Sequence, residues 1–168
     1  WCSSTNRRSI MEPQELLGEH NVTLDGKGRF RLPSSLLNSL GEREDIELVV
    51  NRGFEKCLTL YPKPIWERIS GEVNKLNKYN ERNRQFVRYF YRGATPIKLD
   101  SADRVNLPQR LIDYAGIQKE VILSAMHDRI EIWARTEYDN MLEAEPENFS
   151  ALAEQVLGGS QAELEVEG

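Results

Sequence analysis

The strongest constraint on the fold is an internal repeat: LDGKGRFRLP at Leu24–Pro33 recurs as LDSADRVNLP at Leu99–Pro108. The eighteen residues from Leu24 overlay those from Leu99 without a gap and match at seven positions. The similarity resumes at an offset of 72 residues, where Leu58–Tyr61 overlays Ile130–Trp133. Two copies of one unit therefore make up most of this chain, and a repeat has to be recognised before any other prediction of the fold.

A unit of about fifty residues buries too little apolar surface to be stable alone, so we expect the two copies to pack on each other. The three-residue change of offset predicts a longer loop around Glu42–Asp45 in the first copy. The expected segments are an N-terminal remnant or flexible segment (1–17), a first unit (18–66), a basic helical connection (67–92), a second unit (93–143) and an acidic, flexible tail (144–168).

Alternating polarity on both sides of a glycine turn predicts a β-hairpin at the start of the first unit. His20–Asp25 and Arg29–Leu32 alternate, and Gly26-Lys27-Gly28 lies between them. Because strand side chains alternate between faces, burial of Phe30 and Leu32 would turn Arg29 and Arg31 outward, side by side.

The rest of each unit predicts a short helix, two strands and a further helix. Pro33 and a capping serine open the first helix, and Gly41 is a plausible end for it. The second copy repeats this plan, with Gly116 in the place of Gly41. The expected class is mainly β with short helices (α+β).

Between the copies, a basic helical stretch carries Arg84, Arg88 and Arg92 at a spacing of four residues, hence on one helical face. Aromatic residues fill most of the positions around them. Such a ridge can form an oligomer interface or make a secondary phosphate contact. The last segment, Ser150–Gly168, is small and acidic, and Gly158-Gly159 predicts a break in any helix there.

The formal net charge is −5, but the charge is distributed unevenly. No Lys or Arg follows Arg135, whereas Thr136–Gly168 contains nine acidic residues, so the first 135 residues are net positive. This asymmetry indicates a basic working surface and an acidic tail, although for the tail itself we favour the simpler explanation of a solvated helix with a frayed end.

Composition excludes several classes of protein. The two cysteines have no disulfide-framework spacing and the two histidines no metal-ligand spacing, so we expect no metal and no cofactor. The N-terminus lacks the apolar core of a signal peptide, and no stretch approaches eighteen apolar residues. We expect a cytoplasmic protein with no membrane partner.

Catalytic motifs are also missing: the sequence contains no P-loop, no G-x-S-x-G, no H-E-x-x-H and no C-x-x-C. Asp25 and Asp100 could be paired carboxylates, but a short acidic side chain before a turn more often accepts hydrogen bonds from local backbone amides. Their recurrence beside Arg29 and Arg104 predicts hairpin-shaping Asp–Arg pairs. We therefore expect no catalytic residue and no small-molecule substrate.

Nucleic-acid binding explains the residues of this hairpin better than catalysis does. Arg29 and Arg31 on a hairpin with Lys27 at its turn form a basic ribbon, and such ribbons fit the DNA major groove. Gly28 would allow the backbone to approach the nucleic acid closely. The alternative is that these arginines only solubilise a strand.

The motifs above resemble the MraZ family. The resemblance rests on the two Asp-x-x-x-Arg stretches and on Arg-Tyr-Phe-Tyr-Arg-Gly-Ala between them, and it covers roughly Gly18–Leu142. It is also carried by Leu-Tyr-Pro at Leu60–Pro62, Tyr-Ala-Gly-Ile at Tyr114–Ile117 and Lys-Glu-Val at Lys119–Val121.

This resemblance implies two SpoVT/AbrB-type swapped-hairpin units that form a pseudo-two-fold barrel. It also implies a nucleoid-associated transcriptional regulator of the bacterial division and cell-wall gene cluster. Such a protein would bind direct repeats of double-stranded DNA in its own promoter as a ring-like homo-oligomer.

The second copy departs from the family pattern. Asp103 replaces a glycine, Asn106 the second arginine and Ala102 the basic turn residue. The DNA-binding role therefore falls on Arg29, with Lys27, Arg31 and Gly28, and is doubtful for Arg104. The alternative function is a non-catalytic scaffold whose hairpins bind protein or RNA.

Overall fold

The computed structural model describes residues 15–144 and 148–166, with side chains up to residue 158. Most of the expected N-terminal remnant (1–17) lies outside the described residues. Strand β1, however, begins at Leu16, inside that segment, and the Leu16 side chain is completely buried. Leu16 is therefore part of the folded core.

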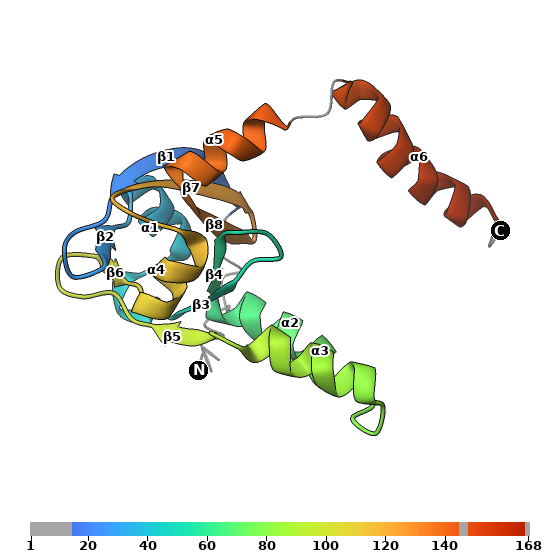
Figure 1. Cartoon of the computed structure of the whole chain (residues 1–168), viewed down its shortest axis with the longest axis horizontal. Coiled ribbons are helices and arrows are strands. Elements are labelled where there is room, and N and C mark those ends of the chain that lie inside the picture. Colours follow the sequence, from blue (N-terminus) through green and yellow to red (C-terminus); the bar gives the residue numbers. More distant parts are fainter. Residues whose placement is uncertain (1–14, 145–147, 167–168) are drawn as a thin grey trace, which may run out of the picture. The chain divides into compact units, whose positions relative to one another are not determined.

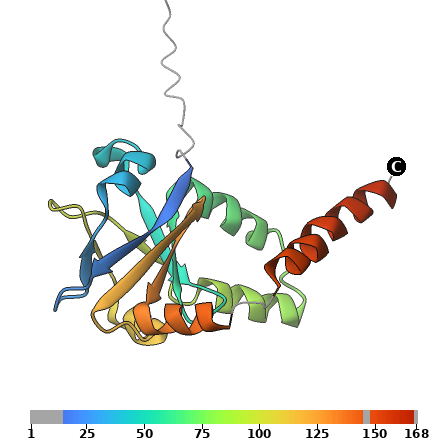
Figure 2. The ribbon, with the colours of Figure 1, turned by 90° about the horizontal axis from the view of Figure 1, so that it is seen from above.

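The described residues form one six-stranded antiparallel sheet and one two-stranded sheet (Figures 1 and 2). The large sheet has the order β1-β7-β8-β4-β3-β5, and β2 pairs only with β6 in the small one. The strands are β1 (Leu16–Thr23), β2 (Arg29–Arg31), β3 (Leu48–Arg52), β4 (Leu58–Pro62), β5 (Thr95–Ile97), β6 (Arg104–Asn106), β7 (Glu120–His127) and β8 (Arg129–Ala134).

The strands on either side of the first glycine turn do not pair with each other, so the predicted hairpin is wrong. Instead, β1 pairs along its whole length with β7, and β2 pairs with β6. In the other direction, β5 of the second copy pairs with β3 of the first. Each copy thus completes its sheets with strands of the other, which satisfies backbone groups that one small unit would leave unpaired.

The strand register relates the two copies by an approximate two-fold axis. In the small sheet Phe30 faces Val105, and these two residues are equivalent in the repeat. In the large sheet Thr59 faces Glu131, again an equivalent pair. Because equivalent residues face each other in both sheets, the axis passes through both.

Six α-helices in the described residues make the fold mixed α/β rather than mainly β. The helices are α1 (Ser34–Leu40), α2 (Lys63–Asn74), α3 (Glu81–Tyr91), α4 (Gln109–Ala115), α5 (Arg135–Glu143) and α6 (Phe149–Val166), with a short 3-10 helix, η1 (Arg43–Asp45), in the loop that is longer in the first copy. α2 and α3 lie between the two copies, and α2 begins at Lys63, four residues before the expected start of the helical connection.

Two local expectations about helix ends are wrong. Pro33, and not a serine, is the N-cap of α1, and it makes no side-chain capping hydrogen bond. α6 continues through Gly158-Gly159, where the sequence predicts a break. Each glycine costs a helix only about 1 kcal/mol, and the Ala, Leu, Gln and Glu residues around this pair are strong helix formers.

By its contacts the chain divides into two compact units, which are not the same as the two repeat copies. From here on, the first unit is the one that ends at Glu137, and the second is the one that begins at Tyr138. The core of the first unit contains apolar residues of both copies, including Phe30, Leu32, Val105 and Leu107, each at most 3% exposed. α1 contacts β1, and α4 contacts β3. This shared core holds the small sheet and its two loops in place.

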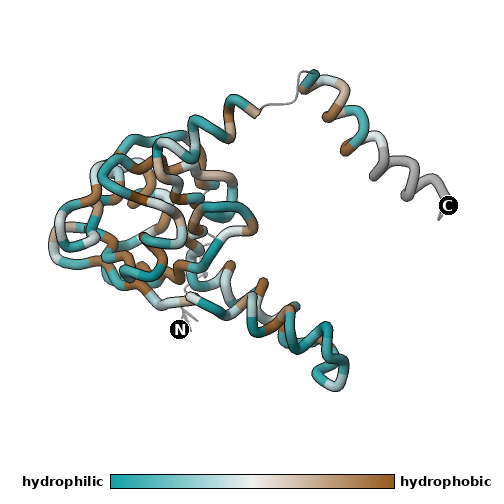
Figure 3. Tube along the Cα trace, viewed as in Figure 1, coloured by the Kyte–Doolittle hydropathy of each residue, from teal (hydrophilic) through white to brown (hydrophobic). Residues whose placement is uncertain are grey.

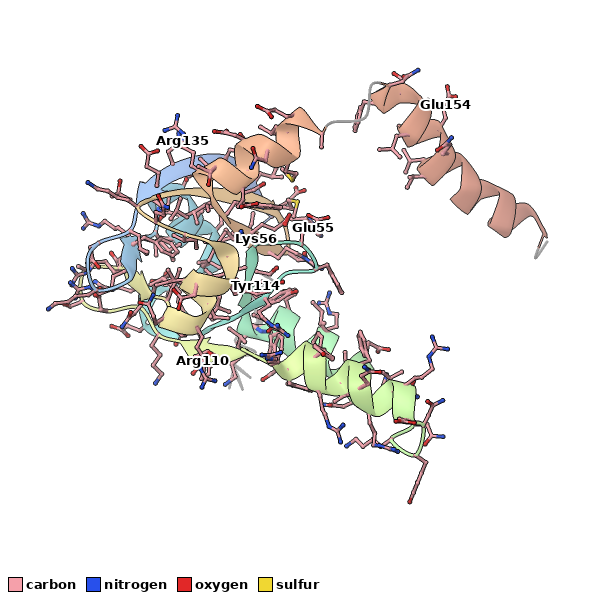
Figure 4. The ribbon with its side chains drawn as sticks, viewed as in Figure 1. Glu55, Lys56, Arg110, Tyr114, Arg135 and Glu154 are labelled. Carbon is pink, nitrogen blue, oxygen red and sulfur yellow. The ribbon has the colours of Figure 1, made fainter. Side chains whose placement is uncertain are left out.

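A polar contact also joins the copies. The Tyr114 hydroxyl of α4 donates to backbone oxygens of the β3–β4 loop, 3.3 Å from that of Gly53 and 3.2 Å from that of Glu55 (Figure 4). The Arg52 guanidinium lies 5.2 Å from the centre of the Tyr114 ring. α4 of the second copy is therefore fixed against the first.

Candidate nucleic-acid interface

The loop between β1 and β2 is closed around the Asp25 carboxylate. Oδ1 accepts hydrogen bonds from the backbone N–H groups of Lys27 and Arg29, both at 2.9 Å. Oδ2 accepts one from Nε of Arg29, also at 2.9 Å. The Gly28 N–H donates to the Asp25 carbonyl, 3.1 Å away, with Gly28 at φ +81°. One side chain thus sets both the turn and the direction of Arg29.

The loop between β5 and β6 repeats this arrangement around Asp100. Its Oδ1 accepts from the N–H groups of Ala102 and Arg104, and its Oδ2 accepts from Nε of Arg104 at 2.8 Å. Asp103 stands in the place of Gly28 and takes the same left-handed conformation, at φ +60°. Aspartate tolerates that conformation better than most residues, which explains how the loop survives the loss of glycine.

These contacts lower the pKa of both carboxyl groups below the ordinary value of 3.8. The largest cause is the backbone hydrogen bond from Arg29 for Asp25, and that from Arg104 for Asp100. Hydrogen bonds to the ionised form favour that form. Both carboxylates are therefore charged at neutral pH and are committed to shaping the loops, which leaves them poorly suited to donating a proton.

The two loops interlock through the small sheet. The Leu107 N–H donates to the carbonyl of Gly28 at 2.9 Å, and the Leu32 N–H donates to that of Asp103 at 3.0 Å. Arg31 and Arg104 are directly opposite each other across the ladder. Both loops therefore leave the fold at the same end, as Figures 1 and 2 show.

The free hydrogen-bond donors are concentrated on the first loop. Lys27 and Arg31 are exposed and form no ion pair with any residue in the described ranges. Arg29 uses only Nε toward Asp25, so within those ranges its two Nη groups make no protein hydrogen bond. An arginine held by Nε with both Nη groups free can still bind a phosphate or a guanine edge.

Arg104 has more acidic partners than Arg29, although its side chain is slightly more exposed, at 33% against 25%. Its Nε bonds to Asp100, and its Nη1 lies 4.0 Å from Oδ2 of Asp25 in the first loop. Two carboxylates thus compete with any ligand for this guanidinium. The difference between the loops agrees with the weaker basic character of the second one.

Sequence reasoning missed one residue of this region, Arg43. From η1 it reaches the second loop, where its Nε lies 2.7 Å from Oδ1 of Asp103 and its Nη2 donates to the carbonyl of Asp100 at 2.8 Å. The only sequence signal was its place in the segment that is longer in the first copy. Arg43 restores positive charge beside the acidic residue that replaces glycine.

The arginines of the helical connection lie elsewhere. Arg84 and Arg88 are exposed on α3, and Arg92 follows directly at its C-cap. Figures 1 and 2 show α3 at the opposite end of the first unit from the two loops. The fold therefore does not bring the six predicted arginines into one surface.

Within the described residues, no three His, Cys, Asp or Glu side chains are placed to hold a metal ion. None of the helices in those residues is long and apolar enough to cross a bilayer.

The fold and the loops together define a class: a tandem repeat with exchanged strands and two Asp–Arg-closed loops at one end. A family described as "MraZ protein, putative antitoxin-like" matches the chain twice, over residues 16–89 and 90–158. The chain belongs to the MraZ family, which confirms the resemblance drawn from its motifs.

Two curated relatives match this chain over nearly the whole of their own length. One, from Christiangramia forsetii, is 35% identical over 144 residues, which is 85% of this chain and 93% of the relative. The other, from Cytophaga hutchinsonii, is 34% identical over 146 residues, 87% of this chain and 97% of the relative. Both are named transcriptional regulator MraZ, which is the name of a regulator and not of an enzyme.

Proposed function

We propose that this protein is a non-catalytic transcriptional regulator, a repressor that binds double-stranded DNA through the loop between β1 and β2. The observation that carries the proposal is the first loop, where Lys27 and Arg31 are exposed, the Nη groups of Arg29 have no hydrogen-bond partner among the described residues, and Asp25 fixes the backbone. Preorganised donors of this kind suit phosphates and guanine edges. The names of the relatives support the same function.

The DNA site in this proposal is a set of short direct repeats in the promoter of its own operon, within the bacterial division and cell-wall gene cluster. A ring-like homo-oligomer of swapped-hairpin barrels would present one strong loop per chain. Linking several weak sites raises the overall affinity by about 10²–10⁴ when the geometry permits simultaneous binding. Such avidity would let a chain of net charge −5 bind DNA and reside at the nucleoid.

The test is a fluorescence titration of the purified protein against DNA from upstream of its own gene and against a scrambled fragment. We expect tight binding of the native fragment that Arg29→Ala abolishes and Arg29→Lys weakens, because lysine lacks the two Nη donors. Lys75→Ala is the matched control: it removes one positive charge from an exposed side chain on the connection, paired there with Glu72.

Salt dependence completes the test, since log K should fall against log salt with a slope of about −0.9 per phosphate contacted. Arg29→Ala should make that slope shallower, and Lys75→Ala should not. Equal, weak and salt-insensitive binding of both fragments by all variants would instead support a scaffold protein.

A further inference from the structure

α3 exposes aromatic side chains although its backbone is held firmly. The Phe90 ring stacks on Trp66 with centroids 5.3 Å apart. Nδ2 of Asn51 donates to the Phe90 carbonyl, and Nη2 of Arg52 donates to that of Tyr89. Phe86 and Tyr89 nevertheless remain 44% and 57% exposed. Exposed aromatics on a fixed helix indicate a binding surface.

These aromatics border a cavity of about 670 Å³, here called the α3 groove. Besides Phe86, Tyr89 and Phe90, apolar side chains of Ile69, Tyr61 and Met126 line it. The groove lies within the first unit and has an open, largely apolar lining. Its shape and chemistry suit the apolar face of an amphipathic helix.

The charged side chains in the groove balance, with Glu55 and Glu131 against Arg52 and Arg129, but the stretch that carries α3 is basic. Residues 75–92 contain six basic side chains and one acidic side chain. Of these, Arg82 lies four residues before Phe86 and therefore on the same face of α3, and no described acidic residue forms an ion pair with it. A helix that fills the groove would therefore gain from carrying negative charge.

α6 has the complementary properties. Phe149, Leu152 and Leu157 are 74%, 40% and 68% exposed, and their spacing of three and eight residues places them on one side of the helix. Figure 3 shows hydrophobic residues at intervals along α3 and along the first part of α6. Glu154 projects from α6 in Figure 4, and the last 33 residues carry nine acidic and no basic side chains.

We propose that the α3 groove of one chain binds helix α6 of a second copy. The apolar side of α6 would cover Phe86 and Tyr89, and an acidic residue of α6 such as Glu154 would pair with Arg82 beside them. Both surfaces are exposed in the single chain, and each chain offers one groove and one α6. Such a head-to-tail contact is heterologous, so it can be repeated from chain to chain and can close a ring.

This inference deepens the oligomer of the proposed function but does not depend on DNA binding. The test is disulfide trapping in a Cys2→Ser background, where the remaining native cysteine, Cys57, is buried. One chain carries Tyr89→Cys and a long tag, and another carries Leu157→Cys and a short tag. After mixing and mild oxidation, a non-reducing gel separates mixed dimers from other products by mass.

We expect the mixed dimer to form several-fold more than with Gln155→Cys, which lies about 200° from Leu157 around the helix. A yield no greater than this control, with unchanged circular dichroism, would overturn the proposal. So would a disulfide found only within single chains carrying both Tyr89→Cys and Leu157→Cys, since α6 would then occupy its own groove.

A second measurement separates this inference from the proposed function. Leu152→Asp with Leu157→Asp should reduce the oligomer mass measured by light scattering, and a single loop should still bind DNA weakly. An unchanged mass would contradict the role of α6 while leaving the DNA-binding proposal intact.

Discussion

Replacing Gly28 by alanine should destabilise the protein much more than the same change two residues earlier. Gly28 has φ +81°, and a Cβ there would lie 3.0 Å from Cδ1 of Ile112 and 3.2 Å from the carbonyl oxygen of Leu107. At Gly26 an added Cβ would meet no atom within 4 Å, and the backbone is not left-handed. The two glycines therefore form a matched pair in one turn.

The expected magnitude follows from two costs. A left-handed conformation costs alanine about 1–2 kcal/mol, and crowding against Ile112 and Leu107 adds about 1–3 kcal/mol. Gly28→Ala should therefore lose about 3 kcal/mol of unfolding free energy. Gly26→Ala should be neutral or should gain up to about 1 kcal/mol, because alanine restricts the unfolded chain.

The assay is urea unfolding at one fixed protein concentration, since oligomerisation makes apparent stability depend on concentration. The slope m should stay constant while the midpoint of Gly28→Ala falls. In a thermal scan the loss corresponds to about 6–12 °C for a chain of this size. If the two variants unfold within about 0.5 kcal/mol of each other, the close packing of this loop against the second copy is wrong.

Three further predictions concern side chains of the same unit. Folding lowers the pKa of Asp25 and Asp100, so the stability that their carboxylates contribute is complete above the ordinary pKa of 3.8 and is lost as the pH falls below it. In an acid titration, the unfolding free energy of the wild type should therefore fall more steeply with pH than that of the Asp25→Asn, Asp100→Asn double variant. Burial raises the pKa of the Cys57 thiol to about 12, so in a Cys2→Ser protein alkylation at pH 8 should be slow until denaturant is added, and rapid native labelling would contradict this burial. Arg43→Ala should cost only about 0.5–1 kcal/mol, since its side chain is half exposed, but should speed hydrogen exchange of the second loop's amides; unchanged exchange would show that Arg43 does not hold that loop.

The repeat and its polarity pattern predict much of each copy. Alternation around Phe30 identified the buried face of β2, and the proline and glycine positions located both short helices, α1 and α4. These features are local, so neighbouring residues determine them. The Asp-x-x-x-Arg spacing is local too, because its hydrogen bonds close within five residues.

The pairing of strands could not be predicted from local sequence patterns. The alternation in β2 is satisfied equally by pairing with β1 or with β6, and only the whole fold decides between them. Arg43 shows the same limit for the site, since it contacts Asp103 sixty residues away across the exchange between copies. The residues next to Arg43 and those next to Asp103 in the sequence give no indication that the two side chains meet.

The exchange of strands has a consequence for the chain during synthesis. Leu16 of β1 pairs with His127, so the first strand finds its partner only after roughly 100 more residues have left the ribosome. At about 5–20 residues per second, β1 would wait for about 5–20 s with its edge unpaired. We therefore expect the protein to complete its fold only after translation of its second half, with the apolar side chains of its N-terminal half exposed until then.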